Sequence, residues 1–338
     1  MRRQIGSGSR PVRDAVLLAL ASAAIGAAAA AAAAAQWRLA DNPRGYGLQA
    51  AELTSARAGI AVGQTVSLRA AILRSTDGGL TFKRVLRLNE NTNLADVRVG
   101  ADGVGYAAGA DRTNALLLQT RDRGQTWRRL TLPATIRGLK ALAVEGSTIL
   151  VGGAATVALS EDAGAHWRRI SIPSAMTDVA AVGLSSDALV VAGTHYGNDG
   201  VIATTTTRGR SWRLQHVSGT AVRFTPLRSL GSTSFSVGYS NAEGAAAIVR
   251  SADRGLTWRT SVLKHMRIVS DVWFTGPTAG WVAYQPGVAP ASAVATTHDG
   301  GRTWKREFLL AGTEPGHLAF RGARGWLLTP HGVFARRY

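Results

Sequence analysis

The sequence predicts an all-β protein that forms a single seven-bladed β-propeller of four-stranded antiparallel blades. Three observations predict this fold: an eight-residue box recurs, its copies are evenly spaced, and two further strand-like segments separate successive copies. A repeat period of about 20–50 residues is typical of solenoids and propellers. The copies are STDGGLTF at 75–82, TRDRGQTW at 120–127, SEDAGAHW at 160–167, TTTRGRSW at 205–212, SADRGLTW at 251–258 and THDGGRTW at 297–304. Their terminal aromatic residues lie 40–46 residues apart.

Each box has the chemistry of a tight turn between two strands. An Asp, or a Thr in one copy, stands two residues before a Gly, so its side-chain oxygen can accept backbone N–H bonds while Gly takes a positive φ. Apolar residues precede each box, and alternating polar and apolar residues follow it. We interpret the aspartates as structural turn caps without a catalytic role. They are Asp77, Asp122, Asp162, Asp253 and Asp299.

The residue after the terminal aromatic of every box is basic. Because side chains alternate along a strand, an aromatic that packs inside leaves the next side chain pointing outward. We therefore predict a basic rim around the outside of the ring. Its members are Arg38, from the N-terminal strand, and Lys83, Arg128, Arg168, Arg213, Arg259 and Lys305.

The segments between boxes bring each blade to four strands, and the N-terminus closes the ring. In the first period we expect strands at 48–53, 59–63, 70–74 and 81–86. After the last box only three strands remain, at 317–320, 325–328 and 332–336. Trp37 and Arg38 repeat the aromatic-then-basic pattern, and Trp37 lies 45 residues before Phe82. The N-terminal strand is thus expected to complete the last blade, which removes exposed sheet edges.

The chain divides into an N-terminal segment at 1–35 and a propeller domain at 36–338. Four arginines precede an uncharged, alanine-rich run at 15–35. This arrangement is typical of a secretory signal peptide or, if the segment is retained, of an N-terminal membrane anchor. Both alternatives place the propeller outside the cytoplasm, because the positive flank stays on the cytoplasmic side. We expect an exported protein of the periplasm, cell envelope or extracellular space.

The boxes resemble Asp-box (BNR) repeats, with the pattern S/T-x-D-x-G-x-T-W. Their even spacing, together with second strands of the G-x-x-V-G type, resembles the propellers of the photosystem II stability/assembly factor-like family, over essentially all of 36–338. Sialidase-type and sortilin-type propellers are more distant resemblances. In these families the Asp boxes lie on the outer hairpins, away from the ligand site. The resemblance is specific for the fold and much less specific for the function.

Functional residues are therefore expected on the face opposite the Asp boxes. There, the loops before the first strand and after the second strand of each blade surround the mouth of the central channel. The boxes repeat, whereas these loops differ from blade to blade. The candidate binding residues are Asp96, Asp178, Asp271, Arg223, His195, Tyr196, Tyr239, Asn241, Tyr284 and His331.

Two functions are compatible with these residues. The first is a non-catalytic propeller that binds or helps assemble a protein partner at the extracytoplasmic face of a membrane. The alternative is a carbohydrate-active propeller, sialidase-like or otherwise a glycosidase or glycan binder, in which Asp96, Asp178 and Asp271 include an acid/base pair. The sialidase signature Phe/Tyr-Arg-Ile-Pro is absent, and no Glu adjoins a Tyr at a strand end. We favour the first function and expect no enzyme activity.

Composition limits the classes of partner and cofactor that we expect. The formal net charge is +18, or +15 without residues 1–35, and the chain has no cysteine. The seven histidines show no H-x-H or H-E-x-x-H spacing, so we expect no metal or other cofactor. A basic rim on an exported monomer suggests an acidic protein or an anionic envelope component, with peripheral or anchored membrane association. Nucleic acid is not expected outside the cell.

Overall fold

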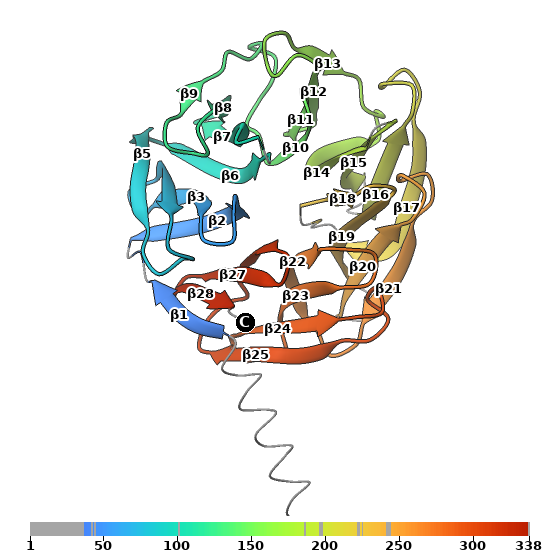
Figure 1. Ribbon diagram of the computed structural model, residues 1–338. Helices are drawn as coiled ribbons and strands as arrows, with labels where there is room; N and C mark the ends of the chain where they lie inside the picture. The colour runs from blue at the N-terminus through green and yellow to red at the C-terminus, as the bar shows by residue number, and fades with distance from the viewer. Residues whose placement is uncertain are drawn as a thin grey trace, which may run out of the picture.

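The computed structural model describes residues 37–41, 43, 45–100, 102–185, 187–195, 199–221, 224, 226–240 and 245–336. Within these residues the strands form seven four-stranded antiparallel blades arranged in a ring (Figure 1), as the sequence predicts. Each blade runs from an inner strand to an outer strand in chain order. The described part of the chain holds no helix that is long and apolar enough to cross a membrane.

The strand bounds follow the repeat closely. Blade 1 consists of β2 (Tyr46–Leu53), β3 (Gly59–Thr65), β4 (Arg69–Ser75) and β5 (Lys83–Glu90). Blade 2 consists of β6 (Thr92–Val99), β7 (Gly105–Asp111), β8 (Asn114–Thr120) and β9 (Arg128–Arg129). Blade 3 consists of β10 (Ala141–Glu145), β11 (Thr148–Gly153), β12 (Thr156–Ser160) and β13 (Arg168–Ile170). Blade 4 consists of β14 (Met176–Ser185), β15 (Ala188–His195), β16 (Asp199–Thr205) and β17 (Arg213–Ala221). Blade 5 consists of β18 (Arg228–Leu230), β19 (Thr233–Ser240), β20 (Ala245–Ser251) and β21 (Arg259–Leu263). Blade 6 consists of β22 (Ile268–Phe274), β23 (Gly280–Gln285), β24 (Ala291–Thr297) and β25 (Lys305–Ala311).

Blade 7 combines the two ends of the propeller. It consists of β26 (His317–Arg321), β27 (Arg324–Thr329), β28 (Gly332–Arg336) and, as its outermost strand, β1 (Trp37–Asp41). β1 pairs antiparallel with β28, with Trp37 opposite Arg336. Figure 1 shows β1, in blue, beside the red strands of the C-terminus. The predicted closure of the ring by the N-terminal strand is confirmed.

The Asp boxes form the predicted capped turns. In the second copy the Asp122 carboxylate accepts the amide of Thr126 at 2.9 Å and its hydroxyl at 2.6 Å. These two hydrogen bonds lower the pKa of Asp122 to about 2, since they favour the charged form. In the copy that lacks Asp, the hydroxyl of Thr207 accepts the amide of Ser211 at 2.9 Å. A hydroxyl can therefore replace the carboxylate as the cap.

Among the described residues, the Asp-box turns of blades 1, 2, 3, 5 and 6 are also bonded to the turn between the first two strands of their own blade. The amide of Arg123 donates to Gly103 O at 3.0 Å, and that of Ala163 donates to Ser147 O at 2.8 Å. The same bond joins Gly78 to Arg57 O in blade 1. Both sets of turns therefore lie on one face of the ring, the Asp-box face. The loops between second and third strands, and the connections between blades, lie on the opposite face.

The glycine at the end of the second strand has a steric role. Four inner strands, β2, β6, β14 and β22, carry a bulge, as between Leu94 and Asp96 in β6. At this bulge the backbone of the inner strand comes very close to the neighbouring strand: a Cβ on Gly109 would lie 2.0 Å from Asn93 O, and one on Gly193 would lie 2.0 Å from Asp178 O. Only glycine accommodates such a close backbone approach, which explains the G-x-x-V-G pattern.

Candidate functional site

Asp96 and Asp271 occupy equivalent positions just after the bulge of an inner strand. Asp96 is 1 % exposed. Its carboxylate accepts the amide of Val97 at 2.9 Å, the guanidinium of Arg98 at 2.6 Å, and the amide of Leu142 in the next blade at 3.1 Å. A carboxylate with its oxygens bonded in this way joins two blades and has no open side for a ligand.

Asp271 repeats this arrangement between blades 6 and 7. It is 2 % exposed, and it accepts the amides of Val272 at 2.8 Å and Leu318 at 3.0 Å. The guanidinium of Arg228, from blade 5, approaches its carboxylate to 3.7 Å. The two aspartates thus hold adjacent blades together at the channel wall.

Asp178 does not share this position. Asp178 pairs with Thr194 of β15. It lies three residues before Ala181, and Ala181, which follows the bulge of β14, is the counterpart of Asp96. Its half-exposed side chain binds Lys140 of blade 3, with both carboxylate oxygens 2.8 Å from Nζ. The three candidate carboxylates are therefore one surface ion pair and two buried blade contacts, because Asp178 stands three residues before the inner-strand position that Asp96 and Asp271 share.

The other candidate binding residues are spread over several environments. Tyr284 is 6 % exposed and lies in the core between blades, where burial raises its pKa. The His195 ring contacts His216 with centroids 5.0 Å apart, and His331 Nε2 lies 3.2 Å from Gly312 O. Tyr239 belongs to β19 and pairs with Ala221. Arg223, Tyr196, Asn241 and the side chain of Tyr239 lie outside the described residues.

A group of charged residues at the channel was not predicted. Glu52, Arg98, Arg228 and Trp273 line a cavity of about 200 Å³. The guanidinium of Arg228 stacks over the Trp273 ring, 3.6 Å from its centroid. The cavity also touches Leu184, Leu230 and Phe274, which stand at or next to the ends of inner strands, so it lies toward the Asp-box face rather than the face favoured by the sequence. The sequence feature that could have revealed this group is a charged residue, such as Glu52 or Arg98, in an otherwise apolar inner strand.

Glu52 is the chemically distinctive member of this cavity. Burial raises its pKa to about 7, against the opposing effect of Arg98 and Arg228. The folded chain therefore holds a proton on Glu52 at pH values where the unfolded chain, with a pKa near 4.5, has released it. This difference lowers the stability of the fold as the pH rises from about 4.5 to about 7.

We expect Glu52→Gln to remove this pH dependence. The variant should match the parent protein near pH 4.5 and exceed its free energy of unfolding by about 3 kcal/mol at pH 8, because the neutral amide carries no burial penalty for charge. Urea unfolding at several pH values measures the difference between the two proteins. Glu145→Gln, at an exposed glutamate, controls for the amide itself. An equal stability difference at pH 4.5 and pH 8 would contradict the assignment.

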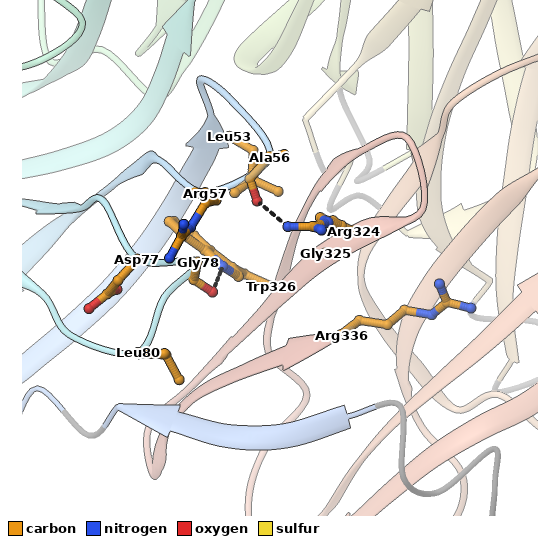
Figure 2. Close-up of a pocket in the computed structure, with 10 residues that line it drawn as sticks. All are labelled: Leu53, Ala56, Arg57, Asp77, Gly78, Leu80, Arg324, Gly325, Trp326 and Arg336. Atoms are coloured by element: carbon orange, nitrogen blue, oxygen red, sulfur yellow. Dashed lines mark hydrogen bonds between the residues drawn. The ribbon is translucent and has the colours of Figure 1, made fainter. Parts of the chain in front are cut away.

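A second cavity lies at the seam between blades 7 and 1. It has a volume of about 280 Å³ and is bordered by Leu53, Arg57, Leu80, Arg324 and Trp326, among other residues (Figure 2). We call it the seam pocket. The Trp326 indole donates to Gly78 O at 3.0 Å, and Arg324 donates to Ala56 O at 3.1 Å. The guanidinium of Arg57 has no partner among the described residues.

Charge and apolar surface meet in the seam pocket. Arg336, which also borders it, donates to Glu307, and Figure 2 shows its guanidinium turned away from the others. Asp77 uses both carboxylate oxygens in its own Asp-box turn. Leu80 is 43 % exposed at the edge of the pocket. Among the described residues that border the pocket, Arg57 is the cation whose guanidinium has no bonded partner, and it stands beside an apolar wall. This arrangement suits a carboxylate next to an apolar group.

All seven residues of the basic rim are exposed. Each stands in the first or second position of an outer strand, where the outer wall meets the Asp-box face. Arg128 donates to Gln119 at 2.9 Å and 2.6 Å, and Arg168 donates to Arg208 O at 3.3 Å. Among the described residues, no group of three or more His, Cys, Asp or Glu side chains is placed to hold a metal ion.

Fold and turns together define an Asp-box β-propeller. The model of one family, described as photosynthesis system II assembly factor YCF48, matches residues 29–169 and 83–254. The chain therefore belongs to the YCF48 family. No curated protein matches the sequence.

Solved structures share the fold at low sequence identity. A structure of YCF48 bound to D1 peptide is 17 % identical, with a TM-score of 0.65, and the match covers 90 % of this chain and 97 % of that one. YCF48 from Cyanidioschyzon merolae is 16 % identical, with a TM-score of 0.61 and coverages of 89 % and 98 %. An ancestral GH74 enzyme is 14 % identical, with a TM-score of 0.51, and the match covers 85 % of this chain but 47 % of that one.

Proposed function

We propose that this propeller binds an exposed segment of a partner polypeptide, through the seam pocket, and assists the assembly of that partner at the extracytoplasmic face of a membrane. Membership of an assembly-factor family supports a protein-binding role. A YCF48 structure that contains a D1 peptide supports a peptide as the ligand. The export features of residues 1–35 support the location.

The single observation that carries the proposal is the free guanidinium of Arg57 beside Trp326 and Leu80. An arginine and aromatic residues next to an apolar pocket are the residue types that dominate binding energy at protein interfaces. A peptide that brings one carboxylate to Arg57 and one apolar side chain to Leu80 would satisfy both groups. The pocket is too small for a folded domain, so a short segment is the fitting ligand.

Photo-crosslinking in the cells that make the protein tests this proposal. A photoreactive phenylalanine derivative replaces Leu80 at the edge of the seam pocket, and as a control it replaces Val66, which is 86 % exposed on the opposite face. We expect a discrete crosslinked polypeptide from position 80 and none from position 66. Adding Arg57→Glu should lower the crosslinking yield about tenfold, whereas Lys264→Glu, on the opposite face, should leave it unchanged.

Two results would count against the proposal. One is the same set of products from positions 80 and 66, which would indicate random collision. The other is a product at position 80 that Arg57→Glu does not reduce, which would show that the cation does not recognise the partner. Circular dichroism of each variant confirms that the fold is retained.

A further inference from the structure

Positive charge is concentrated where the outer wall meets the Asp-box face. The set of residues at this location comprises the turns between first and second strands, the Asp-box turns, and the first two residues of each outer strand. This set includes the basic rim. The described residues of this set contain 18 arginines and lysines against 8 aspartates and glutamates, and all 18 cations are exposed. The described loops on the opposite face contain five such cations and one acid.

The acidic residues of the Asp-box face are already engaged within the protein. Five are the Asp-box aspartates, which cap their own turns, as the Asp253 contacts with Ser251 and Thr257 illustrate. Two others form ion pairs between blades, Glu161 with Arg208 and Asp187 with Arg254, and the eighth, Asp102, accepts the amide of Val104 at 3.0 Å. The excess of ten positive charges is therefore directed to an external partner rather than to acids of the same face.

The N-terminal segment joins the propeller at this same face. Trp37, the first residue of β1, stands opposite Arg336 at the end of β28 that borders the seam pocket with Asp77 and Gly78 of the first Asp box. The uncharged run at 15–35 thus connects to the ring on the Asp-box side. A hydrophobic segment and a set of exposed cations that meet at one face are the two signals that together hold a protein stably at a bilayer.

We propose that the basic rim lies against the surface of a bilayer that contains anionic lipids. The seam pocket opens on the same face, so a partner segment bound there would lie at the level of the lipid headgroups. The basic rim repeats around the ring with one cation in every blade, and a plane of headgroups is the partner that can contact several blades at once. A discrete acidic protein would favour one cluster of cations over the others. Each arginine or lysine near an anionic bilayer contributes about 1 kcal/mol to binding.

The test is co-sedimentation of the full-length chain with vesicles. One vesicle contains phosphatidylcholine alone, and the other contains one third phosphatidylglycerol. We expect tighter binding to the second at about 0.1 M salt and a loss of that preference near 1 M, where the Debye length falls from about 10 Å to about 3 Å. Insertion of residues 15–35 by themselves would give equal binding to both vesicles, and that result would overturn the proposal.

A charge-matched pair of variants locates the contact. The triple variant Arg213→Glu, Arg259→Glu, Lys305→Glu reverses the rim of three consecutive blades. It should bind the phosphatidylglycerol vesicles about a hundredfold more weakly or worse. The control variant Arg87→Glu, Lys264→Glu, Arg267→Glu changes net charge equally at exposed sites away from this face. Equal weakening of both variants would show that net charge alone binds the lipid, and an unaffected rim variant would assign the rim to another partner; either result overturns the proposal.

Discussion

Replacing Trp326 by alanine is expected to lower the free energy of unfolding by about 3–5 kcal/mol, the usual cost of removing a buried tryptophan. Trp326 is 2 % exposed and reaches from β27 in blade 7 to the first Asp box in blade 1. Its ring contacts Phe82 edge-to-face, with centroids 5.1 Å apart. Loss of this side chain leaves a cavity at the seam between the first and last blades.

Two glycines show how tightly this ring is enclosed. A Cβ on Gly59 would lie 2.5 Å from the Trp326 ring, and one on Gly79 would lie 2.6 Å from its Nε1. The surrounding backbone is therefore shaped to the indole, and a smaller side chain cannot fill the space. Gly79 also has a φ of +93° in its turn, a conformation that favours glycine.

Denaturation in urea measures this effect, with two comparison variants. Trp326→Phe should lose less stability than Trp326→Ala, because it keeps most of the apolar volume and loses only the indole hydrogen bond to Gly78. Trp212→Ala, at a partly exposed Asp-box tryptophan, should also cost less. If Trp326→Ala unfolds at the same urea concentration as the parent protein, the seam does not depend on this residue.

Asp96→Ala is expected to destabilise the propeller by about 3–5 kcal/mol, because it leaves Arg98 without its ionic partner in a largely buried site. The substitution also leaves two buried amides, Val97 and Leu142, without an acceptor. The Leu142 bond crosses from blade 2 to blade 3, so the loss falls on a contact between blades. An unsatisfied buried donor adds the full cost of its lost hydration.

Asp178→Ala supplies the matched control. Asp178 is likewise an inner-strand aspartate with a basic partner, Lys140, but both side chains are substantially exposed. Exposed ion pairs contribute about 0–1 kcal/mol. The two variants should therefore differ by several kcal/mol in unfolding free energy at pH 7. Equal losses would show that burial and the bonds between blades do not determine the role of Asp96.

Much of the fold could be predicted because its information is local. The Asp-box turn needs only a hydroxyl or carboxylate, a glycine and a following Thr, Ser or His within eight residues, and its period sets the blade count. Trp37 followed by Arg38 repeats the pattern that ends each box, so closure of blade 7 through β1 could be predicted as well. Alternation along outer strands likewise placed the basic rim on the outside.

The site was less predictable because it is assembled from different blades. We predicted equivalent positions for Asp178 and Asp96, but Asp178 stands three positions before Ala181, the counterpart of Asp96 in its inner strand. The cavity around Glu52 combines residues of blades 1 to 6. No spacing along the chain reports such a contact, because the distance between these residues depends on closure of the ring.

The sequence by itself therefore determined the architecture, the Asp-box turns, the closing strand and the exposed basic rim, since turn chemistry and side-chain alternation act over a few residues. Only the tertiary structure decided which inner-strand charges meet at the channel, which aspartates join blades, and that Arg57 and Trp326 face one pocket at the seam. These outcomes depend on contacts between residues up to about 300 positions apart, as the pairing of Trp37 with Arg336 shows, and such contacts exist only when the first and last blades meet.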